Sequence, residues 1–535
     1  MPLRTMTSVT LTDLSFAWPD GEIALAGITG SFGTGRTGLI GANGSGKSTL
    51  LRLIARELTP TSGSITTSGE VGYLPQSLTL RVESTVAELL GVADKLYAMR
   101  AIESGDVSDR QFDVLADDWD IESRSHAALE QVGLPADALE RRLDRISGGE
   151  AMLVATAGLR LRRTPITLLD EPTNNLDRRA RARLGSLLTS WPGALIVVSH
   201  DVALLDRMDD TAELYGHRLS VFGGGYSAWR EHLDIEQSAA AQAARTAEQA
   251  VRVEKRQRIE AEAKLATRTR MGQKAYENKR APKIIMNSRR SEAQVSAAKL
   301  RAGLDADVQT AQATLDAAEA RLRDAKSIHV DLPDPSVSAG RRIAELRAAN
   351  TTVILQGPER IALVGPNGIG KTTLLEDLVS QRMPGAGPVR THLGTDRVGY
   401  LPQRLDGLDE QASMLENVER AAPGVPPGEL RNRLARFLLR GDSVHRPVAT
   451  LSGGERFRVS LARLLLADPP AQLLVLDEPT NNLDLDSIDQ LVDALRSYRG
   501  ALLVVSHDDA FLERLGLDAV WELDVDGNLT EADAT

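Results

Sequence analysis

Short apolar runs recur along the chain, and a polar or glycine-rich motif follows each of them. Runs of this kind, without alternating polar positions, are typical of strands buried on both faces of a parallel sheet beneath helices. The motifs then lie at the carboxyl ends of strands, where open α/β sheets hold their ligands. The sequence therefore predicts an α/β fold, with strands at Leu39-Ile40, Leu168-Leu169, 194–198, 361–364, 473–476 and 501–505.

Residues 233–328 follow a different pattern, because they are rich in Ala, Glu, Gln, Arg and Lys and contain a single proline. This composition predicts long helices. The pattern is interrupted around 271–287, in MGQKAYENKRAPKIIMN, which contains a glycine and that proline. We therefore predict two antiparallel helices joined by a tip at the interruption.

The motifs occur twice in the same order, which indicates two copies of one domain. LLDEPTNNLD at 168–177 returns as VLDEPTNNLD at 475–484. Glutamine and SGGE are 71 positions apart in the first copy and 49 in the second, so the first copy has an insertion of 22 residues. The predicted organisation is an α/β domain at 1–232, a helical hairpin linker at 233–328 and a second α/β domain at 329–535.

Length and composition narrow the functional classes. A chain of 535 residues is expected to form two or three domains. It has no cysteine, which excludes disulfides, thiolate catalysis and cysteine-ligated zinc. No run approaches the roughly 20 apolar residues of a membrane helix, and the N-terminus lacks the apolar core of a signal peptide, so we expect a cytoplasmic protein.

GANGSGKST at 41–49 and GPNGIGKTT at 365–373 both fit the pattern of a phosphate-binding loop. The pattern needs glycines so that backbone N–H groups can curl around phosphate oxygens, while the lysine supplies positive charge and the next hydroxyl binds magnesium. Two such loops, each between a predicted strand and a predicted helix, rule out a chance match. The candidate ATP-binding residues are Gly41, Asn43, Gly44, Gly46, Lys47, Ser48, Thr49, Gly365, Asn367, Gly368, Gly370, Lys371, Thr372 and Thr373.

Two adjacent acids follow a predicted buried strand in each copy. Asp170 and Asp477 occupy the position at which a carboxylate holds Mg²⁺ in phosphoryl-transfer sites. Glu171 and Glu478 come next and can orient or deprotonate the attacking water. Adjacent acids alone more often belong to a solvated loop, but the preceding strand and the upstream phosphate loop favour the catalytic interpretation.

SGGE is the weakest motif taken alone, since Gly-Gly after Ser also describes a plain helix start. A helix N-terminus is nonetheless a phosphate site. In this order, the phosphate loop, glutamine, SGGE, DEPT and histidine resemble ATP-binding cassette (ABC) ATPase domains. The resemblance implies that the SGGE loop of one domain completes the ATP site of the other, so that a monomer forms two composite sites. The residues of these loops are Ser147, Gly148, Gly149, Ser452, Gly453 and Gly454.

The resemblance also implies roles for the remaining residues. Gln76 and Gln403 would reach toward Mg²⁺, while His200 in site one and His507 in site two would reach toward the terminal phosphate. Trp18 lies where the family stacks an aromatic ring on adenine, and a core or turn tryptophan is the equal alternative. The second domain has no Phe, Tyr or Trp from 327 to 399, which leaves its adenine contact unassigned.

The linker is basic although the chain carries a net charge of −11. Eleven Lys or Arg and two acids occur from Lys264 to Arg301, which favours either a solvated spacer or a finger that contacts RNA phosphates. Tandem cassettes with a long charged helical linker resemble the ABC-F family. This resemblance implies a ribosome partner, with the linker near the peptidyl transferase centre and the peptidyl-site tRNA.

Members of this family act as translation factors or protect the ribosome from antibiotics. The 22 extra residues, within 92–140, are too few for the large arm of some housekeeping members, which favours the resistance type. The tip residues expected to reach the drug region, or else to pack on themselves, are Met271, Tyr276, Ile284, Ile285 and Met286. Phosphate contacts do not distinguish ATP from GTP.

Two other functions share the same motifs. A tandem ATPase subunit that energises a membrane transporter would need no long basic hairpin. A DNA-repair ATPase with cassette domains usually requires zinc or a very long coiled coil. The basic hairpin therefore favours the ribosome-binding hypothesis over both.

Overall fold

The chain forms two units in the computed structural model. One compact unit comprises residues 1–227 and 326–535, and the other spans Ala228–Ala325. The first unit contains both α/β domains, which are called the first and second cassette from here on. The structure describes residues 8–78, 83–277, 283–323, 332–380, 389–403, 407–439, 441–481 and 483–533.

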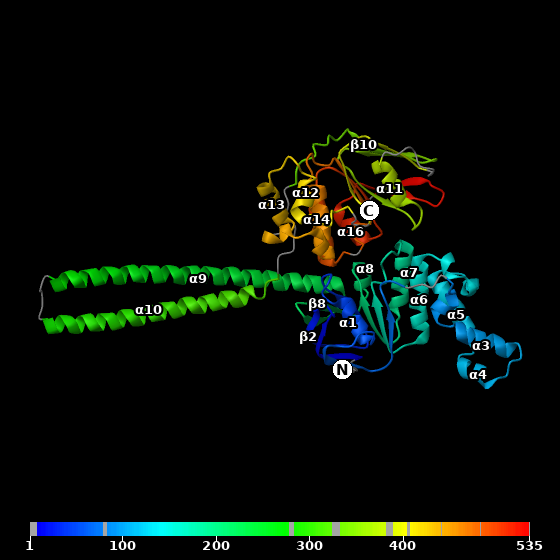
Figure 1. Ribbon diagram of the computed structural model, residues 1–535, viewed down its shortest axis with the longest axis horizontal. Helices are drawn as coiled ribbons and strands as arrows, with labels where there is room; N and C mark the ends of the chain where they lie inside the picture. The colour runs from blue at the N-terminus through cyan, green and yellow to red at the C-terminus, as the bar shows by residue number, and fades with distance from the viewer. Residues whose placement is uncertain are drawn as a thin grey trace. The chain divides into compact units, whose positions relative to one another are not determined.

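The first cassette is built on a parallel sheet with an antiparallel edge (Figure 1). The described strands follow the order β5-β6-β7-β3-β8-β9, and only the β8–β9 pair is antiparallel. All residues of β6 and β7 are buried, as expected for strands covered on both faces. The bounds are β3 (Arg36–Ile40), β5 (Val71–Leu74), β6 (Ile166–Asp170), β7 (Ala194–Val198), β8 (Asp210–Tyr215) and β9 (Arg218–Gly223).

The second cassette repeats this sheet in the same order, which confirms the predicted α/β fold with two tandem cassettes. Its parallel strands again end at the phosphate loop, the DEPT motif and the histidine. The order is β14-β15-β16-β12-β17-β18, with β12 (Arg360–Val364), β14 (Val398–Leu401), β15 (Leu473–Asp477), β16 (Ala501–Val505), β17 (Ala519–Leu523) and β18 (Leu529–Asp533).

Each cassette also has a small antiparallel sheet that the apolar runs did not predict. Its strands are only partly buried and contain register shifts, so they lack the continuous apolar runs of the central strands. The first cassette forms it from β1 (Val9–Ala17), β2 (Ile23–Phe32) and β4 (Ser62–Thr67), in the order β2-β1-β4. The second forms it from β10 (Arg342–Arg347), β11 (Thr352–Gln356) and β13 (Arg390–Leu393).

Helices flank both central sheets, and the first cassette has an additional pair. The 22-residue insertion corresponds to α3 and α4, which have no counterpart among the described helices of the second cassette. The helices of the first cassette are α1 (Lys47–Ile54), α2 (Val86–Leu90), α3 (Ala93–Glu103), α4 (Asp109–Leu115), α5 (Ile121–Val132), α6 (Gly148–Arg162), α7 (Arg178–Thr189) and α8 (Val202–Leu205). Those of the second are α11 (Lys371–Ser380), α12 (Met414–Glu419), α13 (Pro427–Arg436), α14 (Gly453–Leu465), α15 (Leu485–Ser497) and α16 (Asp509–Leu515).

The second unit is a pair of long helices, α9 (Tyr226–Glu277) and α10 (Lys283–Glu319), that lie side by side (Figure 1). Ala247, Val251 and Leu315 form a small apolar cluster between them. Gln237 accepts a hydrogen bond from the Arg323 backbone N–H at 2.9 Å, which joins the two ends of the hairpin near its base.

Both helices extend into the segment 271–287 that the sequence predicted as an interruption. Helix α9 passes through Gly272 and ends at Glu277, and α10 begins at Lys283. One glycine costs a helix only about 1 kcal/mol, so a long helix tolerates it. Of the two proposed linker boundaries, 232/233 lies inside α9, and 328/329 lies outside the described residues. Among the described residues, no helix is long and apolar enough to cross a membrane.

Candidate functional site

The phosphate loop of each cassette connects the central strand β3 or β12 to helix α1 or α11. The Lys47 ammonium donates hydrogen bonds to the carbonyls of Gly41 (2.7 Å) and Ala42 (3.0 Å), which closes the loop. Lys371 makes the same bonds to Gly365 (2.8 Å) and Pro366 (2.9 Å). Both lysines are buried, and this burial lowers their pKa. An anionic phosphate at the loop would compensate for the desolvation of these cations.

Glycine is required where each loop leaves its strand. Gly41 has φ of 152° and Gly365 has φ of 156°. A Cβ atom at these positions would lie 2.6 Å from the Leu214 carbonyl oxygen and 2.5 Å from that of Leu523. Both contacts are with backbone that cannot move aside cheaply, so a side chain would force the loop open and displace its N–H groups.

The aspartates at the ends of β6 and β15 lie beside the hydroxyls of the phosphate loops. Ser48 donates a hydrogen bond to Asp170 (3.1 Å), and the Tyr73 hydroxyl donates to the other carboxylate oxygen (3.4 Å). In the second cassette, both carboxylate oxygens of Asp477 are buried without a hydrogen-bond partner among the described residues. Burial raises the pKa of both aspartates, and the positive charges of Lys47 and Lys371 only partly oppose this rise.

These residues fit Mg²⁺, which is typically held by one or two carboxylates together with substrate phosphates and water. Asp170 with Ser48, and Asp477 with Thr372, supply one carboxylate and one hydroxyl each. Within the described residues, no cluster of three or more His, Asp or Glu could hold a metal by itself. Mg²⁺ would therefore need the nucleotide's phosphates to complete its coordination.

The glutamate after each aspartate contacts the histidine at the end of the neighbouring strand. Glu171 Oε1 lies 3.1 Å from His200 Nε2, and Glu478 Oε1 lies 3.5 Å from His507 Nε2. Both glutamates have positive φ, 49° and 46°, a strained conformation that non-glycine residues adopt mostly where function requires it.

Burial sets the protonation of these pairs. It raises the pKa of Glu478 to about 7 and lowers the pKa of His507 to about 4. Glu171 shifts upward and His200 downward in pKa for the same reason. Although the partners lie at ion-pair distance, burial disfavours both charges, and neither Glu171 Oε1 nor Glu478 Oε1 has a hydrogen-bond partner among the described residues. A glutamate whose pKa lies near neutrality can accept a proton from water.

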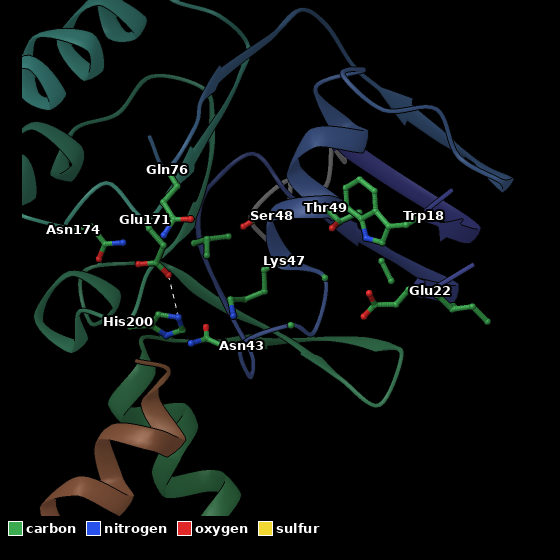
Figure 2. A pocket seen from close by; sticks show the side chains of 15 residues that line it. Trp18, Glu22, Asn43, Lys47, Ser48, Thr49, Gln76, Glu171, Asn174 and His200 are labelled. Carbon is green, nitrogen blue, oxygen red and sulfur yellow. Dashed lines mark ion pairs between the residues drawn. The ribbon is translucent and has the colours of Figure 1, made fainter. Parts of the chain in front are cut away.

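In the first cassette, Glu171 and His200 line a cavity of about 470 Å³ together with Lys47 and Ser48 of the phosphate loop. Figure 2 shows Gln76, Glu171 and His200 on one side of Lys47, and Trp18 with Thr49 on the other. The Trp18 ring packs edge-on against Phe16, with centroids 5.0 Å apart, and Arg52 lies 6.0 Å from its centre. Trp18 thus lines the cavity and also contacts the small sheet. Its contact with adenine stays a prediction.

The corresponding region of the second cassette is built differently. The turn between β10 and β11 carries Asn350, whose side chain is hydrogen-bonded to the backbone of Leu529 in β18. Glu376 occupies the position in α11 that Arg52 occupies in α1. At these two positions, site two therefore has neither an aromatic ring nor a cation, whereas Trp18 and Arg52 provide both at site one.

Each SGGE motif lies at the start of a helix, which agrees with the simpler interpretation of the motif as a plain helix start. Ser147 caps α6 and Ser452 caps α14, and each serine hydroxyl donates to the glutamate of its own motif, Glu150 at 2.8 Å or Glu455 at 2.9 Å. Neither loop lines the described cavity. Closure of each site by the SGGE residues of the other cassette therefore stays a prediction.

The residues that reach the opposite phosphate loop come instead from the end of DEPTNNLD. Asp484 accepts a hydrogen bond from the Asn43 backbone N–H at 2.7 Å. The Asn367 side chain donates to the Asn175 carbonyl at 2.9 Å. Sequence reasoning did not assign a role to Asp484 or Asn175, although the exact repetition of NNLD after DEPT was a signal that could have found them.

The sequence matches the ABC transporter family at residues 14–174 and 348–481. It is 31% identical over 534 residues to the tylosin resistance ATP-binding protein TlrC of Streptomyces fradiae, covering 91% of this chain and 92% of that protein. It is 30% identical over 531 residues to the energy-dependent translational throttle protein EttA of Mycobacterium tuberculosis, covering 94% and 90%. A solved structure of RNase-L inhibitor is similar in fold, with a TM-score of 0.54 at 20% identity, covering 95% of this chain and 87% of that one.

Proposed function

Since this chain belongs to the ABC transporter family, and within it to the ABC-F proteins, we propose that it binds the ribosome in its ATP-bound form and leaves after ATP hydrolysis. The chain is an ATPase with two cassettes. The observation that carries the ribosome proposal is the positive charge of the distal part of the hairpin. Its exposed cations form a surface suited to binding RNA phosphates.

The charge of the hairpin changes along its length. Near the base, Arg252 and Arg256 pair with Glu248 and Glu260 of the same helix. Further out, exposed cations have no ion pair within the described residues; they are Lys264, Arg268, Arg270, Lys274, Lys299 and Arg301. Of the predicted tip, Met271 is exposed, while the side chains of Tyr276, Ile284, Ile285 and Met286 lie outside the described part.

Clustered cations on a long helical projection bind nucleic acid by neutralising phosphates and releasing counterions. The names of the two relatives give independent support, because one is a resistance protein and the other a translational throttle protein. The finer proposal is that the hairpin of a monomer reaches the peptidyl-site tRNA and the peptidyl transferase centre. A ribosome partner would place the protein in the cytoplasm.

Each site would work through residues of both cassettes. Lys47 and Lys371 bind the terminal phosphates, while Ser48 with Asp170, and Thr372 with Asp477, would hold Mg²⁺ with help from Gln76 and Gln403. Mg²⁺ would neutralise phosphate charge when bound. Glu171 and Glu478 accept the proton of the attacking water as its oxygen bonds to the terminal phosphorus and the bond to ADP breaks. His200 and His507 hold the terminal phosphate, and the Ser147 and Ser452 loops close the opposite sites.

The test uses Glu171→Gln with Glu478→Gln, because glutamine retains the shape of the pocket but cannot accept the proton. ATP should still bind, and turnover should fall at least about 100-fold, the usual contribution of a general base. Co-sedimentation with purified ribosomes should then require ATP. Normal turnover would remove the proposed role of the glutamates, and absence of the variant from the ribosome pellet under every condition would remove the ribosome proposal.

The names of the two relatives point to two ribosomal functions, antibiotic resistance and control of translation. The short α3–α4 insertion favours the resistance type. Expression in a tylosin-sensitive host separates them. A resistance factor would raise the inhibitory concentration of tylosin, and the double glutamine variant would not. A translation factor would leave the inhibitory concentration unchanged.

A further inference from the structure

The cavity of the first cassette is lined by an acid to which the proposed hydrolysis gives no role. Glu22 and Glu171 are the two acids among the described residues that line it. Glu171 lies with His200 on one side of Lys47, whereas Glu22 lies with Trp18 on the other (Figure 2). The chemistry proposed above accounts for Glu171 and leaves Glu22 unexplained.

The backbone fixes the position of Glu22 beside Trp18. The Trp18 backbone N–H donates to the Glu22 carbonyl at 2.8 Å, across the turn between β1 and β2. The register of the two strands pairs Ala17 with Ile23, so Trp18 and Glu22 are opposite one another at the next position. Side chains of directly opposite residues lie on the same face of a strand pair. Trp18 and Glu22 therefore reach the cavity together from the end of this turn.

The start of β2 also contacts the phosphate loop. A Cβ atom at Gly46 would lie 2.9 Å from the Ala24 carbonyl oxygen and 2.6 Å from the Leu25 side chain, so the loop packs directly on the strand. Glu22 thus lies between the ring proposed to stack on the base and the loop proposed to hold the phosphates. In a nucleotide the ribose joins these two groups, so the sugar would lie in this part of the cavity.

The chemistry of a carboxylate suits the sugar rather than the phosphates. Its negative charge repels phosphate oxygens, and in its ionised form it only accepts hydrogen bonds. Glu22 is exposed, and its carboxylate forms no hydrogen bond or ion pair with any other residue that the structure describes. The 2′- and 3′-hydroxyls of ribose are adjacent donors that one carboxylate can bind. An acidic side chain holds a ribose hydroxyl in this way in dinucleotide-binding folds.

We infer that Glu22 is a specificity-determining residue of site one: its carboxylate accepts hydrogen bonds from the ribose hydroxyls, so that site one prefers ribonucleotides to deoxyribonucleotides. A site built to hydrogen-bond a hydroxyl disfavours an analogue that lacks it. The inference rests on the function proposed above, in which ATP binds in this cavity.

Site two provides a comparison within the same chain. Its turn between β10 and β11, residues 348–351 (AANT), contains no acid. The Asn350 side chain in this turn is already bonded to the backbone of Leu529. Site two should therefore bind a nucleotide without distinguishing its sugar.

The experiment measures the affinity of each site for ATP, 2′-deoxy-ATP, 3′-deoxy-ATP and GTP by isothermal titration calorimetry. Lys371→Ala leaves site one to be titrated, and Lys47→Ala leaves site two. Glu22→Gln and Glu22→Ala are compared with the parent in both backgrounds. Glu70→Gln is the matched control, because Glu70 is an exposed acid of the same cassette that does not line the cavity. The ratio of the affinities for ATP and a deoxy analogue cancels any general effect of removing a charge, since both carry the same phosphates.

Parent site one should bind ATP about tenfold more tightly than 2′-deoxy-ATP, near the lower end of what a hydrogen bond to a charged group contributes. It should also bind ATP more tightly than 3′-deoxy-ATP. Glu22→Gln and Glu22→Ala should each reduce the preference for ATP over 2′-deoxy-ATP to less than about twofold, and Glu70→Gln should leave it near tenfold. At site two, the preference should stay below about twofold in every variant.

Equal affinities of parent site one for ATP and both deoxy analogues would overturn the inference. A preference for ATP that survives Glu22→Ala would also overturn it, because another group would then bind the sugar. If Glu22→Gln alters only the preference between ATP and GTP, the carboxylate contacts the base instead. Absence of any ATP binding at site one would overturn the proposed function itself, so the two failures are distinguished.

Discussion

Trp18 and Asn350 lie in equivalent turns of the two cassettes, but their side chains make different contacts. Trp18 projects beside the phosphate loop, and its ring lines the cavity. Asn350 is tied to β18 by two hydrogen bonds and presents no ring to a base. Because contacts to the phosphates do not distinguish one base from another, this difference should decide which nucleotides each site accepts.

Trp18→Ala should weaken ATP binding at site one by about 1–3 kcal/mol, the usual contribution of stacking between a base and an aromatic side chain. Trp18→Phe should retain most of the affinity. Fluorescent ATP titration of each variant, carried out in a Lys371→Ala background to disable site two, provides the measurement. An equal affinity of Trp18→Ala and the parent for ATP would assign Trp18 to the core alone.

The α9–α10 hairpin shows how charge can be arranged along an element without changing its fold. Ion pairs at i,i+4 near its base neutralise cations and support the helix by a few tenths of a kcal/mol each. The distal cations are exposed and contribute nothing of this kind within the described residues. Helix stability therefore does not explain these cations, whereas a negatively charged partner would.

Changing Lys264, Arg268, Arg270 and Lys274 to Gln should weaken ATP-dependent ribosome binding. It should also reduce the salt dependence of binding, by a slope of about one for each phosphate that the hairpin no longer neutralises. A matched control changes Arg245, Arg252, Lys255 and Arg256 to Gln, which removes the same charge near the base. Co-sedimentation across a salt series is the measurement. Equal losses of affinity in the two variants would indicate a general charge effect, and circular dichroism checks that both remain helical.

At the scale of the whole molecule, one of the contacts between the two cassettes is made by a residue that also caps a helix. Asp484 caps α15 through the Ser487 backbone N–H and accepts the Asn43 N–H of the other cassette with its second oxygen. Asp177 caps α7 in the same manner, but the second phosphate loop is contacted by the Asn175 carbonyl. The Asp484 carboxylate therefore both caps a helix and contacts the opposite phosphate loop, whereas the Asp177 carboxylate only caps a helix.

Asp484→Ala and Asp177→Ala should each lose about 1 kcal/mol of stability from the missing cap, which thermal unfolding can measure. Only Asp484→Ala should also lose a charged hydrogen bond between the cassettes, worth about 1.5–3 kcal/mol. Its ATPase rate should fall about tenfold or more, while that of Asp177→Ala stays within about threefold. Equal ATPase rates in the two variants would show that the bond to Asn43 does not couple the cassettes.

The sequence alone determined the two copies, the order of the motifs, the parallel strands and the basic linker. These features depend on local patterns: a continuous apolar run specifies a doubly buried strand, and a glycine-rich loop specifies a phosphate site, whatever surrounds them.

Only the tertiary structure decided the rest. The small sheet whose β1–β2 turn carries Trp18 is stabilised by pairing between distant segments. Its half-buried strands contain no continuous apolar run that the sequence would reveal. The contact of Asp484 with Asn43 joins residues 441 positions apart, and no local pattern specifies which surfaces of two folded cassettes meet.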